Sequence, residues 1–431
     1  MTNYIVTDLG FGDCGKGTVV DYLARQGSSL VVRHNGGPNA GHNVVTPGGV
    51  HHTFSQFGSG TFAGAKTFLS HDMLISPLNM MREAGSLIHP TRGQFNLWER
   101  TYISEDCVII TPWHVAINRL LERARGDGRH GSVGEGVGVA VQQALGLRSA
   151  TIRAKDTMGT TAALRERLID CRVELMSTYT EIIDRSPEGQ IMTDPDMIGY
   201  LTGRYFDWRR KAKIVPSDHL SYQMSQVEHT IFEGAQGVLL DEWFGFHPYT
   251  TWSTCTHENA MALLIQYGPP GWGEDFSRIG VIRSVTTRHG AGPLPTEDPE
   301  LTSILRRFES HNTTDPWQGD FRIGHLDLVL HKYAVKVCDG VDEIAVTHMD
   351  LENRWQYCPK YEGLELGIQV PDKGDLEASA INTGLLDTVA KPHLVEADSE
   401  QLLRAIEANL GPVTLLSYGP TANDKRAVVP A

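Results

Sequence analysis

Residues 11–18 gather three glycines, an acid and a lysine directly after an apolar stretch at residues 4–9. A strand that leads through such a loop into a helix can cradle phosphate, because backbone amides approach the anion and the helix N-terminus adds a positive field. The loop is not a Walker A motif, since two residues and not four separate Gly12 from the glycine before the lysine. Asp13 within it would repel phosphate unless a metal ion intervenes or the carboxylate takes part in chemistry. We predict phosphate contacts from Gly12, Gly15, Lys16, Gly17 and Thr18, the alternative being a plain turn that opens a helix.

A second glycine-rich loop lies at residues 35–42 and ends in His42. It follows a short apolar run at residues 30–32, so a strand again leads into a loop. The carboxyl ends of neighbouring parallel strands meet at one edge of a sheet, where ligands bind. We therefore expect Asp13 and His42 to lie at the same edge. The alternative is a loop histidine with a purely structural role.

The composition excludes several classes of protein. The chain has 431 residues, 40% of them hydrophobic, and can bury a large core. Its formal net charge is −14, whereas proteins that bind nucleic acid or membrane surfaces present a basic face. The six cysteines lack the spacing of a zinc site or a disulfide framework, which favours free thiols in a reducing compartment. Neither a signal peptide nor a membrane span is evident, so we predict a cytoplasmic protein (host cytoplasm if the source is viral) without nucleic-acid or membrane partners.

Strand-like and helical patterns alternate along the chain. Strands are predicted at Ile5–Leu9, Leu30–Arg33, Cys107–Thr111, Thr230–Glu233, Ile279–Val285, Glu343–Thr347 and Val413–Ser417. Helices are predicted at Trp113–Ala124 and Leu326–Cys338, where apolar residues recur at helical spacing. This alternation predicts an α/β fold with a large, mostly parallel central sheet flanked by helices, as in P-loop NTPases. We expect a single domain over residues 1–431, with a helical excursion near residues 182–228 and a small hairpin near residues 353–375.

The two loops open a series of motifs that resembles the adenylosuccinate synthetase family. They read Gly-Asp-x-Gly-Lys-Gly and Gly-Gly-x-Asn-Ala-Gly-His, as in that family. Further motifs follow in the family's order at residues 233–241, 287–297, 324–327, 347–350 and 417–420. The resemblance covers nearly the whole chain. It implies a ligase of purine biosynthesis that uses Mg²⁺ and a nucleoside triphosphate, and a homodimer whose active sites are shared between subunits.

The resemblance also implies a two-step reaction at a purine nucleoside monophosphate. The 6-oxo group leaves poorly, so the nucleoside triphosphate first phosphorylates it, and the amine of L-aspartate then attacks C6 and expels phosphate. The residue matching Asp13 removes the N1 proton, and the residue matching His42 donates to the transferred phosphoryl group. Asp13 and the carbonyl group of Gly41 help to hold the metal. Gln236 joins the catalytic set and offers both donors and an acceptor to a purine edge.

Further binding residues carry over from the family one at a time. The purine monophosphate is expected to contact Asn39, Ser132, Val133, Arg148, Gln236 and Thr251. Arg148 would reach the partner subunit's site, although an ordinary surface charge is the alternative for this residue. L-Aspartate is expected at Thr313, Thr314 and Arg322, and the base of the phosphoryl donor at His348, Asp350, Ser417, Gly419 and Pro420.

Departures from the family pattern bear on the substrates. The loop at residues 313–324 keeps one arginine, Arg322, where the family has several, so a contact to the ribose 2′-hydroxyl is lost. His289 stands where the family usually has valine, and Cys14 where it has glutamate. These changes resemble the viral and archaeal branch that acts on dGMP. We predict conversion of dGMP to 2-amino-2′-deoxyadenylosuccinate, on the way to diaminopurine DNA, and the alternative is conversion of IMP to adenylosuccinate for AMP biosynthesis.

The donor nucleotide and the class of activity also have alternatives. Asp350 matches the carboxylate that reads guanine, but His348 replaces a family lysine, which leaves GTP, ATP and dATP open as donors. A GTPase-like regulatory nucleotide-binding protein would hydrolyse nucleotide without needing aspartate. An inactive binding homologue would be expected to lose Asp13 or His42, and both are present.

Overall fold

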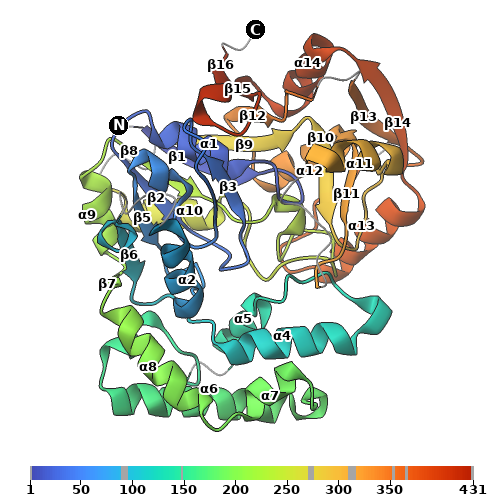
Figure 1. Cartoon of the computed structure of the whole chain (residues 1–431). Helices are drawn as coiled ribbons and strands as arrows, with labels where there is room; N and C mark the ends of the chain where they lie inside the picture. The colour runs from blue at the N-terminus through green and yellow to red at the C-terminus, as the bar shows by residue number, and fades with distance from the viewer. Residues whose placement is uncertain are drawn as a thin grey trace.

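A computed structural model of the chain describes residues 2–88, 96–146, 149–269, 276–308, 317–351, 355–364 and 367–428. These residues form a ten-stranded sheet through the middle of the molecule (Figure 1), in the order β16-β15-β12-β9-β1-β8-β2-β5-β6-β7. Its neighbouring strands are parallel, except that β16 is antiparallel to β15. The strands are β1 (Thr2–Asp8), β2 (Ser29–Arg33), β5 (Lys66–Leu69), β6 (Thr101–Ser104), β7 (Lys213–Val215), β8 (His229–Glu233), β9 (Phe276–Arg283), β12 (Glu343–Thr347), β15 (Val413–Ser417) and β16 (Lys425–Ala427).

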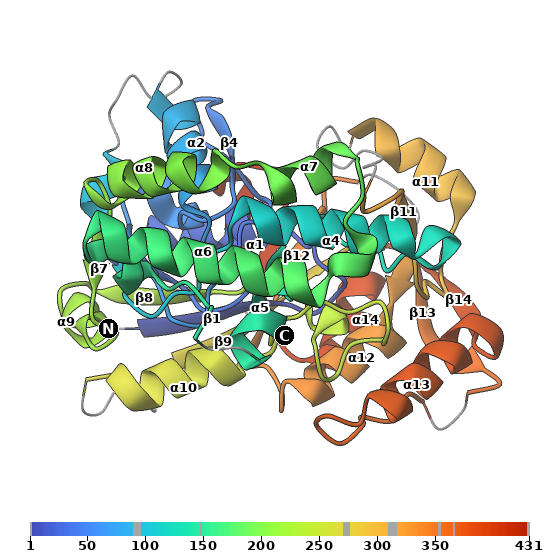
Figure 2. The same ribbon diagram turned by 90° about the horizontal axis from the view of Figure 1, so that it is seen from below.

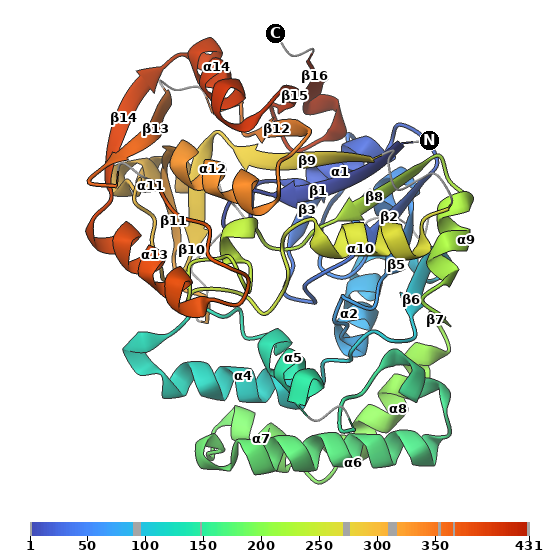
Figure 3. The ribbon, with the colours of Figure 1, turned by 180° about the vertical axis from the view of Figure 1, so that it is seen from behind.

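Helices cover both faces of this sheet, as expected for parallel strands that are buried on each side. They are α1 (Lys16–Ala24) on one face, and α9 (His219–Ser225) and α10 (Glu258–Tyr267) on the other. Successive residues of β1 point to opposite faces. Val6 packs in a cluster with Val19 of α1, whereas Ile5 packs in a cluster with Leu220 and Leu263. Figure 3 shows α10 across the face that lies behind in Figure 1. The predicted α/β fold with a mostly parallel central sheet is confirmed.

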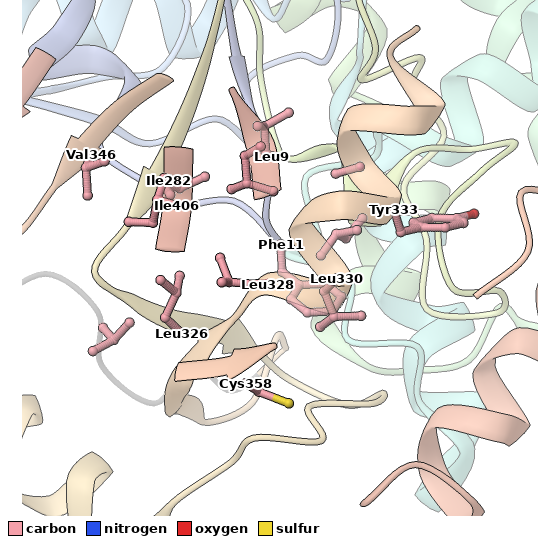
Figure 4. Packing of buried hydrophobic residues seen from close by; sticks show 14 of the residues in the cluster. Leu9, Phe11, Ile282, Leu326, Leu328, Leu330, Tyr333, Val346, Cys358 and Ile406 are labelled. Atoms are coloured by element: carbon pink, nitrogen blue, oxygen red, sulfur yellow. The ribbon is translucent and has the colours of Figure 1, made fainter. Parts of the chain in front are cut away.

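A second sheet, in the order β10-β11-β13-β14, packs beside one end of the first. Its strands are β10 (Val285–His289), β11 (Phe321–Asp327), β13 (Trp355–Glu362) and β14 (Lys391–Ala397), and the helices around it are α11 (Pro299–Leu305), α12 (Leu328–Val337), α13 (Leu376–Thr388) and α14 (Ser399–Leu410). A large apolar cluster joins the two sheets. Figure 4 shows Leu9 and Phe11 of the loop after β1 packed among residues of β9, β11 and α12. The loop after β1 is therefore anchored in the main core.

Helices also form a separate layer beside the central sheet, seen from below in Figure 2. They are α4 (Pro112–Ala124), α5 (Val137–Gly146), α6 (Thr161–Thr178), α7 (Pro187–Thr193) and α8 (Met197–Arg209), and α2 (Pro77–Ile88) and α3 (Leu97–Arg100) lie closer to the sheet. Buried Trp113, Leu168 and Trp208 fill this layer. A short hairpin, β3 (His42–Val45) and β4 (His51–Phe54), follows the second glycine-rich loop. None of the helices in the described part of the chain is both long and apolar enough to cross a membrane.

Several predicted elements differ from the structure. The helical layer is wider than residues 182–228, and that range also contributes β7 to the central sheet. The described part of residues 353–375 holds one strand, β13, whose antiparallel partner β14 comes later in the chain. Cys107–Thr111 is not a strand but an extended segment with isolated bridges, because a short apolar run does not distinguish a strand from a buried loop. Ile279–Val285 is divided between β9 and β10, and the helix predicted from Leu326 begins at Leu328.

Candidate active site

A cavity of about 460 Å³ lies at the carboxyl ends of β1, β2, β8, β9, β12 and β15. Each of these strands contributes lining residues from its last position or from the loop that follows it, and the N-terminus of α1 contributes Lys16, Gly17 and Thr18. This is the edge at which parallel sheets bind ligands, and the volume is typical of small-molecule sites.

Most of the predicted site residues meet in this cavity. Those in its wall are Gly12, Asp13, Gly15, Lys16, Gly17, Thr18, Asn39, Gly41, His42, Val133, Gln236, His348, Asp350, Ser417, Gly419 and Pro420. Ser132, Thr251 and Arg322 are described but do not line it. Arg148, Thr313 and Thr314 lie outside the described residues.

The loop after β1 is organised from within by Asp8. Its buried carboxylate accepts hydrogen bonds from the backbone amides of Gly10, Gly12 and Cys14, at 2.9, 3.3 and 2.9 Å. It also accepts from Lys16 Nζ at 2.9 Å. Burial alone would raise the pKa of Asp8, but the Lys16 charge and these hydrogen bonds outweigh it and hold the pKa below its usual value. Asp8 is therefore an anion, and the backbone amides of the loop turn inward to donate to its carboxylate.

Asp13 projects from this loop into the cavity. Its φ of 60° lies in the left-handed region, which non-glycine residues seldom adopt and which is often found at functional sites. Its Oδ2 lies 3.4 Å from Nε2 of His289. Burial raises the pKa of Asp13 and the nearby Asp8 charge adds to the rise, while His289, Lys16 and Arg283 oppose it. A carboxyl group with a raised pKa is better suited to accept a proton, which fits a general base.

His42 is held by a buried glutamate. Its Nδ1 lies 2.5 Å from Oε1 of Glu233, and Glu233 also accepts hydrogen bonds from the amide and the hydroxyl of Ser59. Burial opposes ionisation of Glu233, but the neighbouring His42 and Arg33 outweigh it and lower its pKa to about 2. The anionic glutamate fixes the ring orientation of His42 and leaves Nε2 on the opposite side of the ring.

Gln236 is prepared for a ligand. It has a φ of 56°, so its backbone is also in the left-handed region. Its side-chain oxygen and nitrogen are both buried without a hydrogen-bond partner among the described residues. Asn39 Oδ1 is in the same situation. Unpaired buried polar groups are costly, so a polar ligand bound in the cavity would supply the missing partners.

The far end of the cavity is formed by the loops after β12 and β15. His348, with a φ of 59°, pairs its Nδ1 with Oγ1 of Thr347 at 2.8 Å. Thr18 of α1 donates to the carbonyl group of Pro420 at 2.9 Å, which ties the phosphate loop to the predicted donor-base loop. Lys425 lies beneath that loop and donates to the carbonyl groups of Gly419 and Thr421.

The residues predicted to set substrate identity differ in part from expectation. Cys14 is 4% exposed, packs in the core beneath the loop and does not line the cavity, so its side chain does not face the cavity. His289 pairs with the Asp13 carboxylate. Arg322 donates to the carbonyl groups of Gly290 and Gly292 and to Glu297, and so braces the loop after β10.

The other two described exceptions also have local roles. The Ser132 hydroxyl donates to Oδ1 of Asn118 at 3.1 Å. Thr251 donates its backbone amide to Leu240. Both residues therefore hold neighbouring loops in shape in this structure.

The donor set suits Mg²⁺. The described residues contain no cluster of three histidine, cysteine or acidic side chains arranged as metal ligands. Mg²⁺ does not need one, because it is usually bound by one or two carboxylates together with substrate phosphates and water. Asp13 and Gly41 both line the cavity beside the phosphate loop, and so fit that requirement.

Three functional side chains were not identified as such from the sequence. Asp8 belongs to an apolar stretch, and its role depends on the turn that follows it. Glu233 and Arg283 are the last residues of β8 and β9, so each ends a largely buried strand. A charged residue at the carboxyl end of such a strand is the signal that could have identified them.

The fold and the cavity define a nucleotide-binding enzyme of the α/β class. The family model described as adenylosuccinate synthetase matches residues 5–374. This chain belongs to the adenylosuccinate synthetase family, and it is a carbon–nitrogen ligase of purine biosynthesis. The predicted family is confirmed, and its members generally use Mg²⁺ and GTP.

Curated relatives and solved structures match this chain over nearly its whole length. Adenylosuccinate synthetases of Francisella tularensis subspecies novicida and mediasiatica are each 28% identical over 457 residues, covering 98% of this chain and 97% of theirs. The fully ligated adenylosuccinate synthetase of Plasmodium falciparum has a TM-score of 0.78 at 20% identity, with 99% of both chains covered. Succinoaminodeoxyadenylate synthetase of cyanophage S-2L, bound to dGMP and dATP, has a TM-score of 0.56 at 16% identity, covering 99% of this chain and 95% of that one.

Proposed function

We propose that the enzyme joins L-aspartate to C6 of a purine nucleoside monophosphate through a 6-phosphoryl intermediate. The observation that carries this proposal is the meeting of Asp13, His42 and Gln236 in one cavity with a phosphate loop. Asp13 takes the N1 proton, so that O6 can attack the γ-phosphorus of the nucleoside triphosphate. His42 donates to the phosphoryl group in transfer, with Glu233 holding its ring. Mg²⁺, when bound by Asp13 and Gly41, neutralises charge on the phosphates.

The second step uses the same arrangement. The aspartate amine attacks C6, the C6–O6 bond breaks, and the phosphate leaves with the electron pair and takes up the proton that the amine nitrogen releases. Gln236 supports this step by keeping the purine edge in register, because its buried amide has both a donor and an acceptor to offer. We propose Thr313, Thr314 and Arg322 for the aspartate side, where Arg322 would act through the loop that it braces.

For the purine itself, we propose dGMP as the preferred substrate. The observation that supports dGMP is the set of hydrogen bonds that Arg322 already donates within the chain, to the carbonyl groups of Gly290 and Gly292 and to the carboxylate of Glu297. A guanidinium bound in this way is not placed to contact a ribose 2′-hydroxyl, which removes a reason to prefer a ribonucleotide. The alternative is IMP, which the names of the curated relatives favour.

A substrate panel separates these possibilities. IMP, dIMP, GMP and dGMP are each supplied with L-aspartate and with GTP, ATP or dATP, and phosphate release is followed with and without aspartate. The proposal expects kcat/KM for dGMP to exceed that for IMP by about tenfold. IMP lacks the 2-amino group, so it would leave a hydrogen-bond acceptor in the site unpaired, at a cost of about 1–3 kcal/mol. A ratio below one assigns the chain to adenylosuccinate synthesis. Phosphate release at the same rate with and without aspartate indicates a GTPase-like protein instead.

We propose a homodimer as the working form. The support is the family's use of an intersubunit arginine, together with exposed apolar side chains on the helical layer, namely Leu145 of α5 and Ile169 and Val173 of α6. An Asp13→Asn chain mixed with an Arg148→Ala chain should regain activity, because one hybrid site then carries both wild-type residues. Light scattering that finds a monomer at working concentration contradicts this.

A further inference from the structure

The balance of charge around the phosphate loop is set by very few side chains. Lys16 and Arg283 are the lysine and arginine residues among the described residues that line the cavity. Lys16 is bound on its inner side, because Nζ lies 2.9 Å from Oδ2 of the buried Asp8 and 2.7 Å from the carbonyl oxygen of Gln236. Lys16 and Asp8 together are therefore neutral. The Asp13 carboxylate adds a negative charge to this side of the cavity, so a further positive charge is needed there to bind a phosphoryl group.

Arg283 brings a second positive charge to the same place. It is the last residue of β9, which pairs with β1 up to Asp8, so it reaches the cavity edge beside the phosphate loop. Its side chain is 2% exposed, and Nη1 lies 3.4 Å from the carbonyl oxygen of Asp13. The guanidinium carbon lies 6.0 Å from the ring centroid of Phe321 on the other side. The guanidinium thus lies between the phosphate loop and β11.

We propose that Arg283 is a catalytic residue whose cation faces the phosphoryl group as it passes from the nucleoside triphosphate to O6. This inference rests on the proposed function, in which Asp13 lies at N1 of the purine. N1 is bonded in the ring to C6, which carries O6, so a cation beside Asp13 is also close to O6. Arginine stays charged at any working pH and presents a planar set of donors to phosphate oxygens.

The transfer itself needs no proton from Arg283. The bond from O6 to the γ-phosphorus forms while the bond from that phosphorus to the bridging oxygen breaks. The nucleoside diphosphate leaves with the electron pair, and the N1 proton passes to Asp13. Negative charge is spread over the three outer oxygens during transfer, and a preorganised cation stabilises this state more than the ground state.

The kinetic test compares Arg283→Gln and Arg283→Lys with Arg278→Gln. Arg278 is a matched control, because it lies on the same strand and pairs with Asp342 outside the cavity lining. For Arg283→Gln we expect kcat and kcat/KM for the ligase reaction to fall together by about 10²–10³-fold, as for loss of one donor to a developing anion. Arg283→Lys should recover part of this, and Arg278→Gln should match the wild type. Scrambling of the β,γ-bridging oxygen of the triphosphate without aspartate should fall in parallel, because it reports phosphoryl transfer alone.

A binding measurement gives a readout that does not need turnover. Calorimetry follows dGMP or IMP binding with Mg²⁺ and nucleoside diphosphate, with and without aluminium fluoride as a mimic of the phosphoryl group in transfer. We expect Arg283→Gln to lose the tightening caused by aluminium fluoride while binding the diphosphate alone as the wild type does. If Arg283→Gln does not fold, as judged by its thermal transition, binding with and without aluminium fluoride is measured with Arg283→Lys instead.

The outcomes separate the two proposals. A wild-type enzyme that shows no aspartate-dependent phosphate release with any purine overturns the proposed function. An active wild type with Arg283→Gln within about threefold in kcat, or with only the KM for nucleotide raised, overturns the role of Arg283 and leaves the ligase function in place.

Discussion

Nδ1 of His42 lies 2.5 Å from Oε1 of Glu233, and both side chains are buried at the carboxyl edge of the sheet. The register of β2 and β8, in which Arg33 is opposite Glu233, brings the loop that carries His42 to the end of the neighbouring strand. The proton donor that we propose for phosphoryl transfer is therefore oriented by the pairing of two parallel strands, and its position is fixed before any substrate binds.

The first prediction is that Glu233→Gln lowers kcat by about 10²-fold or more with little loss of folded protein. A neutral amide no longer stabilises a positive charge on His42 and can hold the ring in the wrong tautomer, and both effects reduce acid–base catalysis. Glu83→Gln is a suitable control, because Glu83 is another buried glutamate that accepts backbone amides, those of Ser55 and Gln56. Steady-state kinetics of both variants decide the point, and equal effects would indicate a structural role for Glu233.

The second prediction is that Asp13→Asn abolishes ligation while the fold is retained. The amide keeps the shape of the side chain but cannot take the N1 proton, and loss of a general base costs roughly 10²-fold or more. Circular dichroism and single-turnover phosphate release measure the two parts. A variant that keeps more than about a tenth of wild-type turnover shows that Asp13 is not the base.

The sequence predicts the outline of the site well, because its loops follow buried strands. Asp13, His42 and Gln236 all follow strands whose carboxyl ends meet, and a parallel sheet brings such ends together whatever the details of packing. The central strands are predicted for the same reason, since strands buried on both faces read as continuous apolar runs.

Side-chain directions are beyond the reach of the sequence. Cys14 is adjacent to Asp13 in the chain, yet one faces the core and the other the cavity, because Asp8 draws the amide of Cys14 inward. Arg322 is in the predicted aspartate-binding segment, but the carbonyl groups of the loop after β10 take its donors. Both outcomes depend on contacts between segments far apart in sequence, which local patterns do not encode.

The third prediction concerns the stability of the enzyme between pH 3.8 and 7. Asp327 caps α12 and accepts a hydrogen bond from Tyr361, but its complete burial raises its pKa from 3.8 to about 7. In this window the native state holds a proton that the unfolded state has lost, so stability falls as the pH rises. We expect urea midpoints of the wild type to decline relative to Asp327→Asn from pH 4 to pH 7.

Asp298→Asn provides the matched control for that measurement. Asp298 caps α11 in the same way, through the amides of Glu300 and Leu301. Those amides hold the pKa of Asp298 below its usual value, so its contribution should be lost as the pH falls and not as it rises. The same pH trend for both variants would contradict the assignment to Asp327.

The last prediction joins stability to nucleotide binding at Lys425. Burial lowers its pKa from 10.5 to about 8, and Asp424, Asp21 and Asp350 only partly oppose this. Between pH 8 and 10.5 the unfolded chain keeps a proton that the native lysine has released, so the stability contributed at this position rises with pH. The unfolding free energy of the wild type should therefore increase relative to Lys425→Met across that interval, with the exposed Lys391→Met as the control.

Lys425 also holds the loop that we propose for the donor base, through the carbonyl groups of Gly419 and Thr421. Removing the ammonium group frees those carbonyls and loosens Ser417–Pro420, which should raise the KM for the nucleoside triphosphate by about tenfold, the equivalent of one hydrogen bond to a charged group. The KM for the purine monophosphate and kcat should change little, because Gln236 and Asp13 are held by the Asp8–Lys16 pair at the other end of the cavity. Initial rates with each substrate varied in turn test this, and an equal rise in both KM values would place the effect of Lys425 on the whole cavity and not on the donor end.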